Sequence, residues 1–311
     1  MEKFASIDIG SNTVRLLIME ADDAGGFKEV HSERVICRLG EGINLEKKLL
    51  PHRMDLTLDV LQRFHDQCRG HGDIPIRVVA TSAVREASNR EEFVRQARER
   101  TGLDVEVISW EEEARLTVEG VFWKLPSSGK TLIFDIGGGS TEFIFSQDKQ
   151  VLASAGTSLG VVRLTEQFIT QHPVDTREYQ NLKTHIREQL DRVHFRLGEP
   201  SPETLIGTAG TVTTLAAMDR NIFPYDPDKI HGLVLPLDNI QRLFEDLKSK
   251  SLEQRLEIPS LERGREDLII AGTALILEIM EVFHCSHLTV SEYSLREGIL
   301  LQASRSQQDP S

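Results

Sequence analysis

Two glycine turns, each preceded by an aspartate and flanked by apolar runs, constrain this chain most strongly. The clearer one lies in residues 131–145, TLIFDIGGGSTEFIF, where an apolar run reaches Asp135 and three glycines and two hydroxyl residues follow. β-Branched and aromatic residues favour strands, and consecutive glycines let backbone N–H groups turn toward an anion with no side chain in the way. The stretch predicts strand, phosphate-binding turn and strand, although taken alone it fits a plain glycine-rich hairpin equally well.

The other turn repeats this pattern at the start of the chain. An apolar run ends near Asp8, and Gly10, Ser11 and Asn12 lead into a second apolar run. A repeat within one chain indicates two related domain cores, and we expect each to present its turn to a shared cleft. The repeat therefore favours a phosphate site over two unrelated hairpins. Each aspartate is placed where a divalent cation shared with phosphate would need an oxygen ligand.

Composition and charge narrow the class of protein. The chain has 311 residues, 39% hydrophobic and 27% charged, as is usual for a soluble globular protein with room for two domains. Its net charge of −13 has the wrong sign for a broad nucleic-acid-binding surface. No apolar run approaches the roughly 20 residues of a membrane helix, and no leader sequence is expected before the first strand. The three cysteines are scattered, so their spacing indicates neither disulfides nor a zinc site. We expect a cytoplasmic protein with no nucleic-acid or membrane partner.

Strands and helices alternate in the first half of the chain. Residues 76–80 and 103–108 are short apolar strand candidates, and residues 81–100 between them are a helix candidate. This order implies a parallel crossover and an α/β fold. At the start of the helix, Arg85 follows two hydroxyl residues, a combination suited to an oxyanion because helix N-terminal N–H groups carry partial positive charge. Either hydroxyl could equally be a plain N-cap.

Another helix is predicted from Ser109 onward. Ser109 and Glu112 fit a capping box, and Glu111 favours the positive end of the helix, so neither glutamate needs a functional explanation. Glu113 is left over. It is either a further first-turn carboxylate or a general base, and the spacing alone favours the first interpretation.

The Pro, Ser and Gly residues in 124–131 predict a linker between domains. We expect one domain from residues 1–124 together with 299–311, and a second from residues 125–298.

In the second domain, residues 157–164 predict a helix start capped by a hydroxyl, and residues 176–197 a long polar helix. Residues 205–214 form a third strand, glycine turn and helix start, in which Gly210 could cradle an anion or a nucleoside, or allow close packing. Residues 266–283 predict a helix with apolar residues around most of its circumference, which must be buried.

Five motifs stand in the order typical of one family: DIGSNT at 8–13, EEARL at 112–116, DIGGGSTE at 135–142, GTAGT at 207–211 and LREG at 295–298. The sequence resembles, over essentially its whole length, the exopolyphosphatase and guanosine pentaphosphate phosphohydrolase (Ppx/GppA) family in its short two-domain form. The resemblance implies two actin-like (ribonuclease H-like) α/β domains of the superfamily of acetate and sugar kinases, heat-shock chaperones and actin, with an active-site cleft between the domains.

The resemblance also assigns roles. Glu113 matches the position of the catalytic base, so the resemblance favours the general base over the plain first-turn carboxylate that the spacing alone favoured. Glu142 could be a second carboxylate that positions metal or water. Asp135 and Asp8 match the acids associated with magnesium, or manganese in its place. Matching phosphate or substrate contacts are Ser11, Asn12, Arg85, Gly138, Gly139, Ser140, Thr141, Gly210 and Arg265.

The implied activity is hydrolysis of a phosphoanhydride. Water activated by a glutamate would release terminal orthophosphate from inorganic polyphosphate, the 5′-phosphate of guanosine pentaphosphate, or both, with a metal ion assisting in a homodimer. Two alternatives stay open. One is a phosphotransferase or ATPase of the same superfold, and the other is a non-catalytic sensor of guanosine tetra- or pentaphosphate.

Overall fold

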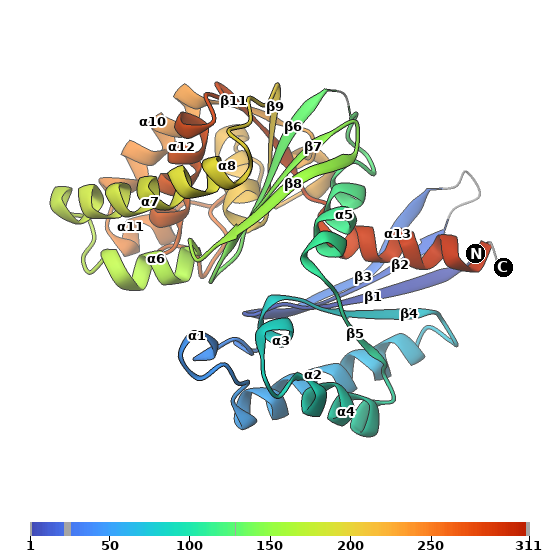
Figure 1. Cartoon of the computed structure of the whole chain (residues 1–311). Coiled ribbons are helices and arrows are strands. Elements are labelled where there is room, and N and C mark those ends of the chain that lie inside the picture. Colours follow the sequence, from blue (N-terminus) through green and yellow to red (C-terminus); the bar gives the residue numbers. More distant parts are fainter. Residues whose placement is uncertain (1, 22–25, 128, 309–311) are drawn as a thin grey trace. The chain divides into compact units, whose positions relative to one another are not determined.

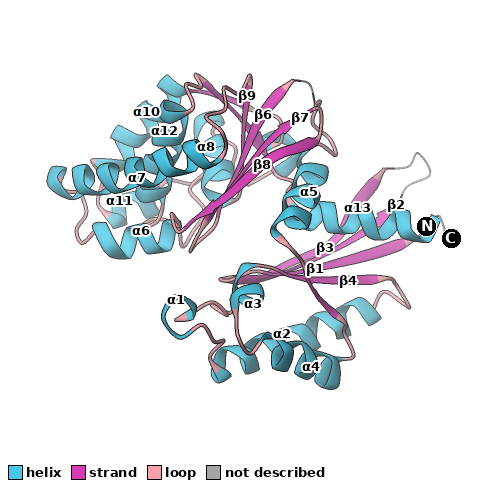
Figure 2. Cartoon of the chain, viewed as in Figure 1, coloured by secondary structure: helices cyan, strands magenta, loops and turns pink. Residues whose placement is uncertain are grey.

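The computed structural model describes residues 2–21, 26–127 and 129–308 (Figures 1 and 2). The chain forms two compact units: unit 1 is Met1–Trp123 with Leu295–Ser311, and unit 2 is Lys124–Ser294. The expected boundaries, after residues 124 and 298, lie one and four residues later than the observed ones at 123 and 294. Residue 128 of the expected linker and residues 309–311 lie outside the described residues. A cleft shared by the two units stays a prediction.

Unit 1 contains a sheet with the strand order β3-β2-β1-β4-β5. Strands β1, β2 and β3 are antiparallel neighbours, whereas β4 and β5 are parallel to β1. The elements in chain order are β1 (Lys3–Ile9), β2 (Thr13–Ala21), β3 (Phe27–Ile36), α1 (Ile43–Glu46), α2 (Pro51–Arg69), β4 (Ile76–Ala80), α3 (Ser82–Glu86), α4 (Arg90–Thr101), β5 (Val105–Val107), α5 (Trp110–Val121) and, after unit 2, α13 (Leu295–Gln308).

Unit 2 repeats this arrangement with the strand order β10-β11-β9-β6-β7-β8. Strands β6, β7 and β8 are antiparallel, β9 and β11 continue parallel to β6, and the short β10 is added at the edge. Its elements are β6 (Lys130–Ile136), β7 (Thr141–Gln147), β8 (Gln150–Thr157), α6 (Val161–Phe168), α7 (Thr176–Arg196), β9 (Thr204–Thr208), α8 (Gly210–Arg220), α9 (Pro227–Ile230), β10 (Val234–Pro236), α10 (Leu237–Lys248), α11 (Leu252–Leu256), α12 (Ile269–Val282) and β11 (His287–Ser291). The prediction of two related α/β cores is confirmed.

Helices cover both faces of the sheet in unit 1 (Figure 1). Side chains alternate along β1: Ala5, Ile7 and Ile9 belong to the core cluster that α2 and α4 complete, whereas Phe4 packs with Leu300 of α13. Because side chains two residues apart share a face of a strand, Asp8 lies on the α13 face.

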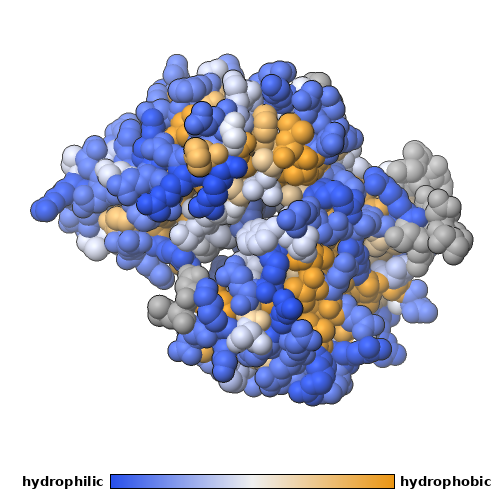
Figure 3. Space-filling view, in the orientation of Figure 1, coloured by the Kyte–Doolittle hydropathy of each residue, from blue (hydrophilic) through white to orange (hydrophobic). Residues whose placement is uncertain are grey.

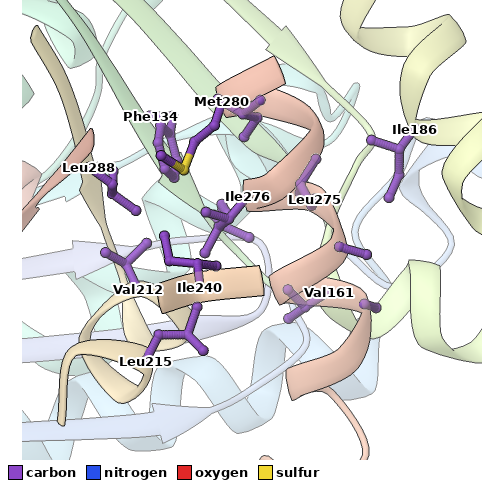
Figure 4. Packing of buried hydrophobic residues seen from close by; sticks show 14 of the residues in the cluster. Phe134, Val161, Ile186, Val212, Leu215, Ile240, Leu275, Ile276, Met280 and Leu288 are labelled. Carbon is purple, nitrogen blue, oxygen red and sulfur yellow. The ribbon is translucent and has the colours of Figure 1, made fainter. Parts of the chain in front are cut away.

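The core of unit 2 is built around α12, whose side chains are buried on nearly every side. Figure 4 shows Ile276 and Met280 of this helix on the side of Phe134 of β6 and Val212 of α8, and Leu275 on the other side, toward Ile186 of α7. The predicted buried helix is therefore confirmed, although it starts at Ile269 rather than at residue 266. Phe134 faces this core, so Asp135 points to the other face of the sheet.

Two expectations about helices are wrong. The single helix expected over residues 81–100 is interrupted between α3 and α4, because the side-chain amide of Asn89 pairs with the backbone N–H and carbonyl of Leu49, and Ser88 donates to the carbonyl of Lys47. Such side chain to backbone bonds compete with a continuous helix. Helix α6 has Gly160 at its N-cap and no side-chain cap, where a hydroxyl was expected.

No helix among the described residues is long and apolar enough to span a membrane. On the face in Figure 3 most residues are hydrophilic, and apolar residues form smaller patches between them.

Gly298 provides a test of the packing in unit 1. A Cβ at this position would lie 1.9 Å from the backbone carbonyl oxygen of Leu116, so α13 approaches α5 as closely as only glycine allows. We expect Gly298→Ala to reduce the free energy of unfolding by about 2–3 kcal/mol, because a backbone atom must move. Urea unfolding measures the change. Gly139→Ala is the control, since its Cβ would meet no atom within 4 Å, and equal stability losses for the two variants would contradict this packing.

Candidate active site

The candidate residues of unit 1 gather at the carboxyl ends of its parallel strands. Ile9 of β1 pairs with Ala80 of β4, and Ala80 pairs with Val107 of β5, so the three strands end at one level. Ligands of α/β sheets bind at this edge. The segments that follow the three strands carry Ser11, Asn12, Arg85 and Glu113.

The turn after β1 is fixed by its backbone. The carbonyl of Asn12 accepts hydrogen bonds from the N–H groups of Cys37 and Arg38, at 3.0 and 2.9 Å, and the carbonyl of Ser11 accepts one from Gly40 at 2.8 Å. Within the described residues, the side chains of Ser11 and Asn12 make no hydrogen bond, and both residues are half-buried. The backbone is therefore fixed, and the hydroxyl and amide groups on it are available to donate or accept hydrogen bonds.

Arg85 and Glu113 form a close ion pair. Nη1 of Arg85 lies 2.9 Å from Oε2 of Glu113 and 2.9 Å from the carbonyl oxygen of Ile108. The two side chains are only 13% and 14% exposed, which strengthens the interaction over that of a surface pair. A carboxylate and a guanidinium are thus adjacent at the edge of the sheet.

The structure separates the three glutamates in the first turn of α5. Glu112 pairs with Arg115, whose hydrogen bonds lower the pKa of Glu112, and its N–H donates to Oγ of the N-cap Ser109. The expected capping box is only half formed, because the carboxylate of Glu112 turns to Arg115 instead. Glu111 is exposed, and bonds from its own N–H and from Ser109 lower its pKa. Glu113 alone is directed to Arg85.

The parallel strands of unit 2 also end together. Asp135 of β6 pairs with Thr208 of β9, and Thr208 pairs with Ser291 of β11. Oγ of Ser294, just beyond β11, donates a hydrogen bond of 2.7 Å to Oδ2 of Asp135 and so orients that carboxylate.

Asp135 has a second acidic residue beside it. Glu142 is its direct partner across the β6–β7 hairpin, so the two carboxylates project from one face of the sheet. Oγ of Ser140 donates to Oε1 of Glu142 at 2.6 Å. Thr141 is fully buried, and its hydroxyl donates to the carbonyl of Leu159.

The glycine turn 137–140 directs its carbonyls away from the edge. The N–H groups of Val161 and Val162, at the start of α6, donate to the carbonyls of Gly137 and Gly138. A Cβ on Gly160 would lie 2.3 Å from the carbonyl oxygen of Gly138, so only glycine permits this approach. Within the described residues, the amides of Gly138 and Gly139 donate no hydrogen bond to the protein. These donors suit phosphate oxygens.

Gly210 and Arg265 are in contact. A Cβ on Gly210 would lie 1.9 Å from Nη2 of Arg265, so the guanidinium lies against the backbone at the start of α8. The preceding residue, Ala209, has φ 76° and ψ 171°, a region that is essentially restricted to glycine. Strained backbone of this kind is common at functional sites. The contact with Arg265 leaves the first N–H groups of α8 beside a positive charge.

Comparison with known proteins identifies the family of this chain. Residues 17–307 match the Ppx/GppA phosphatase family. The chain belongs to the Ppx/GppA phosphatase family. It is similar to Exopolyphosphatase 2 of Mycobacterium tuberculosis, with 31% identity over 97% of this chain and 98% of that protein. Among solved structures it is similar to the Aquifex aeolicus family member, with 33% identity, a TM-score of 0.86 and 99% of each chain covered, and to an exopolyphosphatase from Cytophaga hutchinsonii, with 28% identity, a TM-score of 0.84 and 98% of each chain covered.

These full-length matches confirm the predicted family and the two-domain α/β fold of this Ppx/GppA protein. They show a phosphatase, and they leave the individual roles of the site residues as predictions.

Three residues at or near the site escaped the sequence analysis of this Ppx/GppA protein. Trp110 lies 3.8 Å from the Arg85 guanidinium, measured from Cζ to the ring centroid, and Ser294 holds Asp135. Arg255 is completely buried, donates to the carbonyls of Leu247 and Glu266, and so fixes the segment that carries Arg265. Burial lowers the pKa of Arg255 to about 10. No motif marks these residues, since their partners are distant in sequence or are backbone atoms.

The oxygen ligands that the described residues offer can be compared with those that the expected magnesium or manganese ion needs. The described residues contain no group of three or more His, Cys, Asp or Glu side chains that could hold a metal. Asp135 with Glu142 in unit 2, and the buried Asp8 in unit 1, offer few protein ligands each. This fits Mg²⁺, which keeps several waters and binds through one or two carboxylates together with substrate phosphates.

Ala209 provides a test of strain at the site. We expect Ala209→Gly to increase the free energy of unfolding by about 1 kcal/mol, because relief of strain exceeds the entropy that glycine adds to the unfolded chain. Ala217→Gly, inside α8 and fully buried, is the matched control and should lower stability. Chemical denaturation of both variants measures whether the free energy of unfolding rises or falls. A lower free energy of unfolding in both variants would show that Ala209 is unstrained.

Proposed function

We propose that this phosphatase releases terminal orthophosphate from inorganic polyphosphate by attack of water that Glu113 activates. The observation that carries the proposal is the Arg85–Glu113 pair, in which a carboxylate lies beside a guanidinium where the parallel strands of unit 1 end. This is the edge at which α/β sheets commonly bind their ligands. The similarity to proteins named exopolyphosphatase, over nearly the whole chain, supports polyphosphate as the substrate.

Each group would have a distinct part in the reaction. Arg85 and the amides of Gly138 and Gly139 bind phosphate oxygens and offset their charge. Glu113 orients the attacking water and accepts its proton, a contribution that is typically ~10²–10⁴-fold. Asp135 of unit 2 and Asp8 of unit 1 are each a proposed carboxylate ligand of Mg²⁺ or Mn²⁺, and an ion held by such a ligand would neutralise charge on the phosphoryl oxygens. Ser294 keeps the Asp135 carboxylate oriented for that role.

Guanosine pentaphosphate is the other substrate that we propose for the same site, because the family includes phosphohydrolases of both kinds. Steady-state kinetics with a ladder of polyphosphate lengths and with the nucleotide would rank the two. Release of orthophosphate without any acceptor distinguishes hydrolysis from phosphotransfer. A sensor would bind these compounds and release none.

Glu113→Gln tests the base. The amide keeps the size and one acceptor oxygen but cannot take a proton, so we expect phosphate release from polyphosphate to fall by at least about 100-fold with the fold unchanged. Circular dichroism and urea unfolding check the fold. Glu111→Gln, two residues earlier on the exposed side of the same turn, should keep full activity. Near-normal turnover by Glu113→Gln would refute the assignment.

The contact between Gly210 and Arg265 predicts a non-additive effect. Gly210→Ala should displace the guanidinium end of the Arg265 side chain at little cost to stability. We expect it to raise KM for polyphosphate by roughly 3- to 10-fold, as we also expect for Arg265→Ala. In the double variant the alanine methyl has room, so KM should equal that of Arg265→Ala alone. The exposed neighbour Arg263→Ala is the control. Additive effects would mean that the two residues act separately.

A further inference from the structure

Trp110 has an unusual position for a large apolar residue. It is the first residue of α5, directly after the N-cap Ser109, and is 39% exposed. Its ring lies 3.8 Å from the Cζ atom of Arg85, well within the roughly 6 Å over which an aromatic ring attracts a guanidinium. The tryptophan thus covers one face of the arginine that is paired with Glu113.

The remaining donors of Arg85 are left for another acceptor. Nη1 is occupied by Glu113 and by the carbonyl of Ile108. Nε and Nη2 are buried and have no hydrogen-bond partner among the residues that the structure describes. These two atoms form the side-on edge through which a guanidinium binds two oxygens of one phosphate or carboxylate. An unpaired buried donor is costly, so this edge favours an oxyanion as its partner.

We propose that Trp110 is a positioning residue for Arg85, and that it holds the buried Nε–Nη2 edge in the orientation in which this edge binds two oxygens of a single substrate phosphate when that phosphate enters the site. The ring face and Glu113 together leave the guanidinium one orientation. One arginine then binds the phosphate and holds the carboxylate beside it, so the distance between substrate and base is set by a single rigid group. This inference rests on the proposed function, since it names how that site grips its phosphate.

Binding through Arg85 is present before and during the reaction, so the effect should fall on KM. We expect Trp110→Ala to raise KM for polyphosphate by about tenfold and to change kcat by less than about threefold, the size of a partly buried cation–π contact. Trp110→Phe keeps an aromatic face and should restore most of the loss. A KM within twofold of the parent for Trp110→Ala, or an equal loss in kcat alone, would overturn the proposal.

The chain offers an optical control, because Trp110 and Trp123 are its only tryptophans. Trp123 packs edge-to-face on Phe27, with ring centroids 5.9 Å apart. In a Trp123→Phe protein, emission comes from Trp110 alone. We expect it to change saturably with inorganic tripolyphosphate, and the midpoint to shift at least about tenfold on adding Arg85→Lys, which lacks the side-on edge. No response in a folded Trp123→Phe protein would reject the inference.

The two proposals fail separately. A protein that hydrolyses no polyphosphate but whose Trp110 emission responds to tripolyphosphate through Arg85 retains this inference and loses the proposed function. If Trp110→Ala hydrolyses polyphosphate with an unaltered KM, the proposed function stands and the role of Trp110 is rejected.

Discussion

The register of the parallel strands determines where chemistry can occur in this protein. Because β1, β4 and β5 end at one level in unit 1, and β6, β9 and β11 in unit 2, the segments after them meet at one edge of each sheet. A shift of one residue in β1 would turn Asp8 to the α2 and α4 face, where its carboxylate would take the place of Ile7 or Ile9 in the apolar core. The apolar alternation of the strands therefore fixes the aspartates as firmly as it fixes the core.

Close backbone approaches then set the site to finer precision. Gly160 allows α6 to donate its first N–H groups to the glycine-turn carbonyls, which leaves the opposite side of that turn to the amides. Gly298 lets α13 lie directly on α5, the helix that carries Glu113. In both cases a side chain at the contact would push a site element away by about the diameter of a methyl group. Positioning errors of that size are enough to impair catalysis.

Local chemistry made much of this predictable. The two aspartate–glycine turns, the crossover after β4 and the buried α12 follow from alternation, turn residues and apolar periodicity. The interruption at Asn89 was not predictable, because its cause is the backbone of Leu49, a partner from a distant segment. The strand β8 was missed because several of its residues are small and favour strands only weakly. The helix α10 was overlooked, although its apolar residues recur every three to four positions. At the site, Glu113 could be separated from Glu111 and Glu112 only by resemblance, whereas the structure separates them by their partners.

Electrostatics explains why an acidic protein can hold a polyanion. With a net charge of −13, the long-range field of the protein repels a polyanion, and at physiological ionic strength this repulsion is screened beyond about 8 Å. Binding must then come from short contacts in a medium of low dielectric, where a charge–charge interaction is several times stronger than in water. Arg85 meets these conditions: it is nearly buried, covered by Trp110 and fixed by Glu113. The same burial makes its Nε–Nη2 edge, which has no hydrogen-bond partner among the described residues, unfavourable without an anion. Under the proposed function, a few enclosed donors of this kind, and not the surface charge, would select phosphate.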